Sequence, residues 1–209
     1  MKKPLRFNKN IIIPINNGKY DTLEADNFYH IFNRGNNKED LFIEHENYLH
    51  FLKLIKTHLA PIASIFSYCL MKNHFHLVLK INSKEQLEQI NVNLDKISQP
   101  FSNLFNAYTK SINKRYDREG SLFKVRFKRE RINTEEYLKN VIIYTHLNPV
   151  KHNFQNDYSN YKYSSYQSLI SEKPTLLMRN EVFELFSNKE NFIYHHTEIF
   201  RKGYHEDFD

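Results

Sequence analysis

The chain of 209 residues contains only four glycines and a single cysteine. So little glycine argues against a glycine-rich loop that cradles phosphate groups, and neither GxGxxG nor GxxxxGK[ST] occurs. The lone cysteine, Cys69, excludes an intramolecular disulfide and any zinc site built from several cysteines. We therefore expect no nucleotide cofactor, because the common nucleotide-binding loops are missing.

Long apolar runs are also missing. The aliphatic run IIIPI at residues 11–15 is too short for the apolar region of a signal peptide. No run approaches the roughly 20 apolar residues of a membrane-spanning helix. The chain is nevertheless 40% hydrophobic and 15% aromatic, which is enough for a sizeable core. We expect a soluble cytoplasmic protein with no membrane partner.

Positive charge is concentrated in one segment. Residues 110–131 carry nine basic and three acidic side chains, a net charge equal to the +6 of the whole chain. Aromatic residues are interleaved with the basic ones, which favours phosphate contacts combined with base stacking. The alternative is a solvated hairpin whose charges protect an edge strand. Together with two residues of the earlier turn RGNNK, the candidate nucleic-acid-binding residues are Arg34, Lys38, Lys114, Arg115, Arg118, Lys124, Arg126, Lys128, Arg129 and Arg131.

Hydrophobic periodicity predicts the order strand, helix, strand, strand, helix, strand, helix. The predicted elements are a strand at 27–34, a helix at about 44–58, a hairpin of strands at 62–71 and 74–81, a helical region ending near 116, an extended or strand segment at 121–132 with one charged face, and a helix capped by Asn133 and ended by Asn148–Pro149.

This order predicts an α+β fold. We expect a ferredoxin-like sandwich, an antiparallel sheet with helices packed on one of its faces, plus a small C-terminal helical appendage. The predicted divisions are an N-terminal arm at 1–25, a catalytic domain at 26–150 and a C-terminal extension at 151–209.

Two histidines stand one residue apart in NHFHLVL, residues 73–79. On a strand, His74 and His76 project to the same face, where two neutral imidazoles can share a divalent cation. The alternative is a pair of buried histidines satisfied by hydrogen bonds. Two protein ligands hold a metal weakly, so a third ligand is expected from another element.

The last predicted helix offers such a ligand. Tyr144 and Asn148 are four residues apart and therefore share one stripe of the helix. A phenol and an amide oxygen beside paired histidines suit attack on a phosphodiester, because a cation draws charge from the phosphate and tyrosine attack conserves the bond energy for religation. Tyr137 is the rival nucleophile, and Asn148 is alternatively a residue that ends the helix before proline.

Five sequence blocks resemble the single-tyrosine HUH transposases, and within them the REP-associated tyrosine transposase branch. The resemblance runs from about Asn27 to Ser168. The blocks are YHIFNRGNNKEDLF, YCLMKNHFHLVLKI, GSLFKVRFKRERI, YLKNVIIYTHLNPVKH and YKYSSYQSL, in the family's order.

The resemblance implies a DNA endonuclease and strand transferase. It implies HUH histidines at His74 and His76, a nucleophile at Tyr144 and an amide ligand at Asn148, where many insertion-sequence relatives have glutamine. The family binds Mg²⁺ or Mn²⁺ and cleaves single-stranded DNA beside an imperfect hairpin, leaving a 5′-phosphotyrosine and a free 3′-OH. Such proteins occur as monomers or homodimers.

Two other functions stay open at this point. One is a nucleic-acid-binding protein of the same fold that recognises repeat hairpins without cleaving them, and the other is a phosphodiesterase that uses water as its nucleophile. Among the remaining histidines, His146 and His152 are expected to orient the helix end or to contact phosphate. Four are expected to be solvated: His45, His50, His195 and His196.

Overall fold

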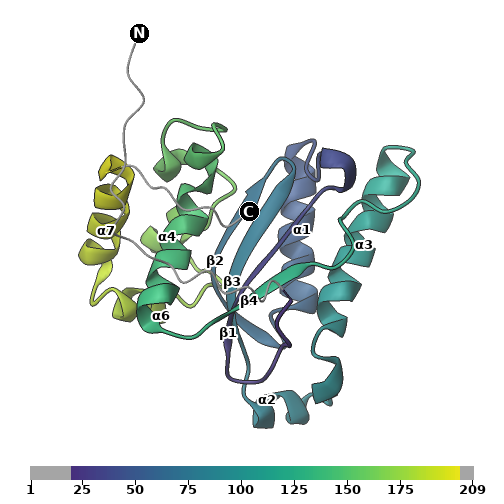
Figure 1. The fold of residues 1–209 in the computed structure, drawn as a ribbon, viewed down its shortest axis with the longest axis horizontal. Coiled ribbons are helices and arrows are strands. Elements are labelled where there is room, and N and C mark those ends of the chain that lie inside the picture. The colour runs from purple at the N-terminus through teal and green to yellow at the C-terminus, as the bar shows by residue number, and fades with distance from the viewer. Residues whose placement is uncertain (1–19, 203–209) are drawn as a thin grey trace.

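The computed structural model describes residues 20–202, which contain a four-stranded antiparallel sheet in the order β2-β3-β1-β4 (Figure 1). This strand order, with helices in the connections, confirms the predicted α+β, ferredoxin-like fold. The predicted arm lies outside the described residues apart from residues 20–25. The elements up to residue 151 are β1 (Phe28–Arg34), η1 (Asn36–Lys38), α1 (His45–His58), β2 (Ala63–Met71), β3 (His74–Ile81), α2 (Lys84–Gln89), η2 (Leu94–Lys96), α3 (Gln99–Arg115), β4 (Lys128–Ile132) and α4 (Glu135–Lys151).

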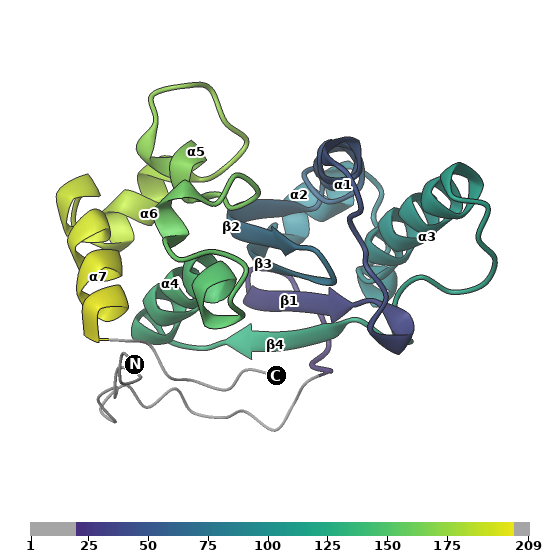
Figure 2. The ribbon, with the colours of Figure 1, turned by 90° about the horizontal axis from the view of Figure 1, so that it is seen from above.

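Helices cover both faces of the sheet (Figure 2). On one face α1 contacts β3 through Phe51 and Phe75, whose ring centroids are 5.1 Å apart. On the other face α4 contacts β3 through Tyr144 and His76, whose centroids are 5.4 Å apart. The expectation that all helices share one face is therefore wrong. Residues 77–79 show why: they are fully buried, and successive side chains of a strand point to opposite faces, so both faces need cover.

Local signals set where the first helices begin. At the start of α2, Ser83 and Gln86 form a capping box, a pattern that can be read from the sequence. Pro100 lies in the first turn of α3, where its missing N–H removes no helical hydrogen bond. The apolar stripe of this helix is buried: Phe101, Leu104, Phe105, Tyr108 and Ile112.

Both ends of α4 differ from the prediction. The N-cap is Thr134, whose side chain accepts a hydrogen bond from the backbone N–H of Tyr137, and not Asn133. The helix also continues through Pro149 to Lys151. A proline this close to the end removes one helical hydrogen bond, and the next turn still closes because the His152 N–H donates to the Asn148 carbonyl at 3.0 Å.

The charged segment at residues 121–132 is a strand only in its second half, which is β4. The strand begins at Lys128, whereas Arg126 adopts a left-handed φ of 64° that interrupts the apolar–basic alternation. Phe123 instead forms an isolated bridge with Gly35, the residue after β1. Gly35 has no room for a side chain, because a Cβ there would lie 2.0 Å from the Glu39 carbonyl oxygen.

The residues after α4 pack along the free edge of β2. Backbone hydrogen bonds join Leu70 to Tyr163 at 3.0 Å and Tyr68 to Ser165 at 2.9 Å, so this edge is covered rather than left open. No helix within residues 20–202 combines the length and the apolarity needed to cross a membrane. The elements of this part are η3 (Tyr158–Asn160), α5 (Tyr166–Ile170), α6 (Arg179–Leu185) and α7 (Lys189–Lys202).

Candidate active site

The two histidines of β3 lie on the face of the sheet that α4 covers. Their ring centroids are 5.3 Å apart, and the rings are perpendicular to each other. In the β1–β3 register His76 pairs with Phe32 and His74 pairs with Arg34. The expectation that both imidazoles share one face therefore holds in the backbone geometry, because they are two residues apart on a regular strand.

His76 is buried between β1 and α4, with 1% of its surface exposed. Its Nδ1 lies 2.9 Å from Nε2 of His30, and the two rings are stacked. Within residues 20–202 its other nitrogen, Nε2, is buried and has no hydrogen-bond partner. Burial, followed by the positive charges of nearby groups, chiefly His30 and His74, holds the pKa of His76 well below its usual value. Burial thus favours the neutral ring, which is the form that binds a metal.

His74 is half-buried and is oriented by its neighbour in sequence. Its Nδ1 lies 2.7 Å from the amide oxygen of Asn73. Because that oxygen only accepts hydrogen bonds, Nδ1 carries the proton and the lone pair of the ring is on Nε2. His152, the C-cap residue of α4, lies against this ring with centroids 4.8 Å apart. The end of α4 and the paired histidines thus meet at this ring contact.

Tyr144 faces the same group of rings but is fully buried. Its ring is perpendicular to that of His76, with centroids 5.4 Å apart, and its centroid is 5.9 Å from that of His30. Lys151 lies over the ring, with its Nζ 5.0 Å from the centroid. Tyr137, the rival nucleophile, is seven residues earlier on α4, which corresponds to about 10 Å along the helix axis.

Asn148 is fully buried one turn after Tyr144. Its Nδ2 donates a hydrogen bond to the Tyr144 carbonyl at 3.0 Å. Its amide oxygen has no partner among the described residues, as is also true of Nε2 of His76. An unpartnered buried oxygen and an unpartnered buried imidazole nitrogen are the donor types that bind a divalent cation, so these residues fit one.

Residues 20–202 contain no group of three His, Cys, Asp or Glu side chains arranged to hold a metal ion. Any cation held here would therefore have only the two histidines from that set. The remaining positions fall to amide oxygen, water or a bound phosphate, which Mg²⁺ in particular accepts as ligands.

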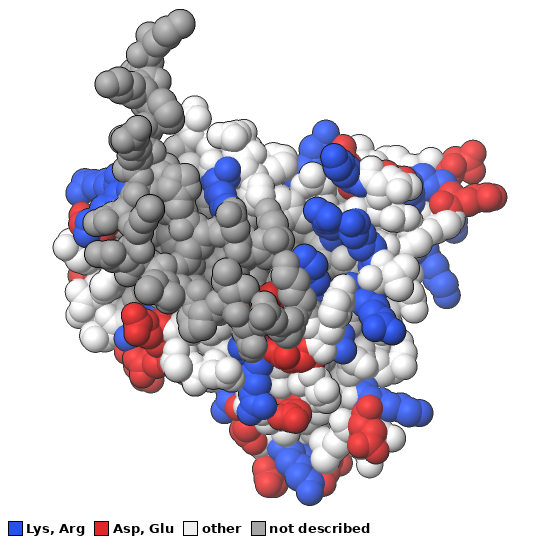
Figure 3. Space-filling view, in the orientation of Figure 1, with Lys and Arg blue, Asp and Glu red and all other residues white. Residues whose placement is uncertain are grey.

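A cleft of about 400 Å³ opens beside the histidines. Its walls come from the end of β1, the turn between β2 and β3, and the segment before β4, and both His74 and His76 line it. Figure 3 shows Lys and Arg side chains gathered on the face where Figure 1 draws the segment leading into β4. Five of the predicted nucleic-acid-binding residues line the cleft: Arg34, Lys38, Lys124, Arg126 and Lys128.

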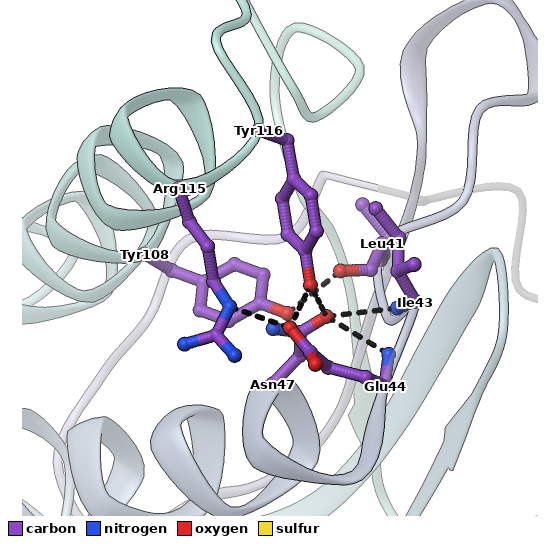
Figure 4. A network of polar contacts seen from close by, with 7 residues as sticks. All are labelled: Leu41, Ile43, Glu44, Asn47, Tyr108, Arg115 and Tyr116. Atoms are coloured by element: carbon purple, nitrogen blue, oxygen red, sulfur yellow. Dashed lines mark hydrogen bonds and ion pairs between the residues drawn. The ribbon is translucent and has the colours of Figure 1, made fainter.

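The other predicted basic residues lie elsewhere. Lys114 is exposed near the end of α3. Arg115 pairs with Glu44, the N-cap of α1, which also accepts a hydrogen bond from the hydroxyl of Tyr116 (Figure 4). These two hydrogen bonds, the one from Arg115 first, lower the pKa of the Glu44 carboxyl. Arg115 therefore joins the end of α3 to the start of α1.

Three further arginines of the set are also engaged within the chain. Arg118 pairs with Glu39. Arg129 donates to the Asp21 carbonyl at 2.6 Å, and Arg131 pairs with Glu24 at 2.9 Å. The structure thus separates the predicted basic set into five residues at the cleft and five away from its walls.

Two histidines expected at the surface or at phosphate form a second buried pair. His196, expected to be solvated, is fully buried, and its Nε2 lies 2.8 Å from Nδ1 of His146. Nε2 of His146 lies 2.7 Å from the hydroxyl of Ser165. The prediction for His196 is wrong because α7 packs against α4, a contact between segments 50 residues apart.

Sequence reasoning missed His30. The residue lies on the predicted strand at 27–34, and its period-two spacing from Phe32 was readable. Its contact with His76 depends on the register between β1 and β3, which no local pattern specifies.

No protein-family model matches the chain, and no curated protein matches it in sequence. Among solved structures, the chain is similar to a REP-associated tyrosine transposase bound to a REP hairpin, with a TM-score of 0.57 and 16% sequence identity. The match covers 74% of this chain and 87% of that chain. At this identity the likeness establishes a shared fold.

Proposed function

We propose that the protein is a metal-dependent endonuclease and strand transferase that acts on single-stranded DNA beside a hairpin, with Tyr144 as its nucleophile. One observation carries the proposal: a single cleft is lined by the paired histidines and by five basic side chains, with Tyr144 packed directly behind His76. The shared fold with a transposase bound to a REP hairpin supports DNA hairpins as the partner.

The metal ligands in this proposal are Nε2 of His74, Nε2 of His76 and the amide oxygen of Asn148. Two buried atoms that have no hydrogen-bond partner within the described residues, Nε2 of His76 and the amide oxygen of Asn148, support the assignment. A bound Mg²⁺ or Mn²⁺ supplies charge that stabilises a non-bridging phosphate oxygen during displacement.

The side chains around the cleft bind and orient the DNA. The exposed Lys124 and Arg126 and the half-buried Lys128 contact the phosphates, because cations beside a cleft neutralise the backbone of a single strand. The phenol oxygen of Tyr144 attacks phosphorus and releases its proton to water. The bond from phosphorus to the 3′ oxygen breaks, that oxygen takes a proton, and a 5′-phosphotyrosine remains.

The attack requires a movement of the last turn of α4. Tyr144 is fully buried, and Lys151 covers its ring. This arrangement is thus a closed state in which the nucleophile is protected until DNA enters the cleft. Lys151 and His152, at the end of the helix, are the first side chains that DNA phosphates would draw away.

The full burial of Tyr144 also favours a second candidate function. A protein of this fold that binds hairpin DNA without cleaving it needs the basic cleft but no accessible phenol. The two candidates differ in one product, the covalent adduct between protein and DNA.

The test uses a labelled oligonucleotide with a hairpin flanked by single strands, incubated with the full chain and Mn²⁺. The proposal predicts a covalent adduct that survives denaturing electrophoresis and is lost in Tyr144→Phe but kept in Tyr137→Phe. Binding without adduct or cleavage supports the non-cleaving protein. Cleavage that persists in Tyr144→Phe indicates water as the nucleophile.

A further inference from the structure

His30 contacts the ring of His76 on the side opposite the unpartnered nitrogen. The rings are stacked with an interplanar angle of 18° and centroids 5.1 Å apart, and the contact joins Nε2 of His30 to Nδ1 of His76 at 2.9 Å. Both side chains are at least 99% buried. The two ring nitrogens contact each other directly. The position of the proton in this contact therefore determines the tautomer of each ring.

Only one hydrogen lies between the two nitrogens. If His30 donates it, a neutral His76 carries its own proton on Nε2, where the described residues offer no acceptor. If His76 donates it, Nδ1 carries the proton and the Nε2 lone pair is left for another ligand. In either arrangement one ring carries its second proton on the nitrogen that points away from the contact, so burial alone does not choose between them. Only the second arrangement leaves a metal-binding lone pair on His76.

We propose that His30 is a positioning residue, which accepts the Nδ1 proton of His76 and thereby keeps the Nε2 lone pair available to a divalent cation at the cleft. This inference rests on the metal site of the proposed function and assigns a role to a residue that does not itself touch the metal or DNA.

His74 also has an acceptor for its Nδ1 proton, but the acceptor is an amide oxygen and not a second imidazole. Nδ1 of His74 donates to the amide oxygen of Asn73, so its lone pair is also on Nε2. Each histidine of the pair thus has an acceptor for its Nδ1 proton. Such outer partners orient metal-binding imidazoles and raise their basicity.

A buried carboxylate stands beside His30. Glu130 is 6% exposed and lies opposite His30 in the β1–β4 register. Directly opposed residues on antiparallel strands keep their Cβ atoms about 4.5–5.5 Å apart. A negative charge at this distance favours a proton on the outer nitrogen, Nδ1, of His30, which leaves its Nε2 as the acceptor that His76 needs.

The first test reads the proton positions directly and needs no metal. Long-range ¹H–¹⁵N NMR spectra of the metal-free full chain distinguish a protonated from an unprotonated nitrogen in each imidazole ring. We expect His76 to be protonated at Nδ1 and unprotonated at Nε2. A proton on Nε2 of His76 overturns the inference, whatever the metal affinity.

The second test measures Mn²⁺ affinity from the free-ion EPR signal in the wild type and in variants. His30→Phe should weaken binding by about 10–100-fold, the usual effect of removing an outer partner of a metal ligand. His30→Gln, whose amide oxygen can still accept the Nδ1 proton, should retain affinity within a few-fold. His196→Gln is the matched control, since it removes one ring of the other buried pair, and should bind as the wild type does.

The outcomes separate the two proposals. Equal affinities of wild type and His30→Phe overturn the role of His30 alone. A wild-type chain that binds no Mn²⁺ overturns the metal site of the proposed function, and with it the role of His30 toward a metal. If His30→Phe melts far below the wild type, its affinity is not used. The inference is then tested by the affinity of His30→Gln and by the NMR result on the wild type.

Discussion

The molecule contains two buried histidine pairs with nearly equal contact distances, 2.9 Å in His30–His76 and 2.8 Å in His146–His196. In the second pair every ring nitrogen has a partner, because Nδ1 of His196 donates to the Phe192 carbonyl at 2.7 Å and Nε2 of His146 accepts from Ser165. In the first pair the chain of contacts ends at Nε2 of His76, which has none within residues 20–202.

The difference separates a structural pair from the pair that we propose to serve a metal site. The His146–His196 pair joins α4 to α7 and lies in an environment closed by protein groups. The His30–His76 pair ends at a cleft lined with basic side chains. Burial and imidazole contacts alone therefore do not identify a metal site. The proposed metal site differs by having a buried nitrogen without a hydrogen-bond partner among the described residues, beside the cleft.

The largest expected effect comes from removing the unsatisfied nitrogen. His76→Ala should abolish detectable adduct formation, a loss greater than the roughly 10–100-fold expected for an outer partner. His196→Ala, which removes an imidazole from the other pair, should keep the Mn²⁺-dependent adduct at a temperature where it is folded. A His76→Ala variant that forms adduct at the wild-type rate contradicts the assignment.

For the free energy of unfolding, we expect the larger loss from His196→Ala and the smaller loss from His76→Ala. His196→Ala leaves a buried nitrogen of His146 without its partner and creates a cavity, so the free energy of unfolding should fall by about 2–4 kcal/mol. Thermal denaturation measures this as a melting temperature lowered by roughly 5–15 °C. Mn²⁺ should raise the melting temperatures of wild type and His196→Ala equally and leave that of His76→Ala unchanged, because only a bound ligand stabilises the fold. An Mn²⁺ effect lost in His196→Ala would contradict the separation of the two pairs.

Acid should destabilise the fold through the structural pair. Burial lowers the pKa of His196 to about 3, the His195 charge adds to this, and the hydrogen bond to Phe192 opposes it. In the unfolded chain this histidine has an ordinary pKa of about 6.5. Between these two pKa values the unfolded chain binds a proton at His196 and the folded chain does not. Stability from this group is complete above about pH 6.5 and falls by up to about 1.4 kcal/mol per pH unit below it.

Denaturant titrations at pH 7.5, 6.5 and 5.5 measure this slope. His196→Gln should be less stable than the wild type at pH 7.5 and should show a shallower decline between the two lower pH values. Parallel declines in the two proteins would mean that other groups cause the acid sensitivity.

The smallest expected effect is on DNA binding. Lys124→Gln with Arg126→Gln removes two cations from the cleft, so the slope of log affinity against log salt should become shallower by about 1.4, at about 0.7 per phosphate contact on a single strand. The matched control, Lys53→Gln with Lys56→Gln, removes two exposed cations from α1, on the other face of the sheet. Equal slopes for the two double variants would place the DNA elsewhere.

Much of the fold was predictable because it depends on local patterns. The β2–β3 hairpin follows from two dense apolar runs around a two-residue turn, and the start of α2 follows from Ser83 and Gln86. The end of α4 was not predictable, since the helix tolerates Pro149 within its last turn. The break at Arg126 was equally hidden, because a left-handed φ at arginine has no sequence signal.

The site was predictable only where its residues are close in sequence. The shared face of His74 and His76 follows from strand geometry, and the stripe of Tyr144 and Asn148 follows from helix geometry. His30 and His76 are 46 residues apart in sequence, and their contact depends on how β1 and β3 align, which no local pattern specifies. The division of the basic residues between the cleft and internal ion pairs likewise depends on tertiary packing, as Arg115 with Glu44 illustrates.

Anomalous scattering of Mn²⁺ in crystals of the full chain would locate the proposed metal site directly. We expect a peak at the cleft, about 2.0–2.3 Å from Nε2 of His76, with His74 on the same ion and His30 still against Nδ1 of His76. The absence of a peak at His76 from crystals saturated with Mn²⁺, or a peak held by other residues, would contradict it.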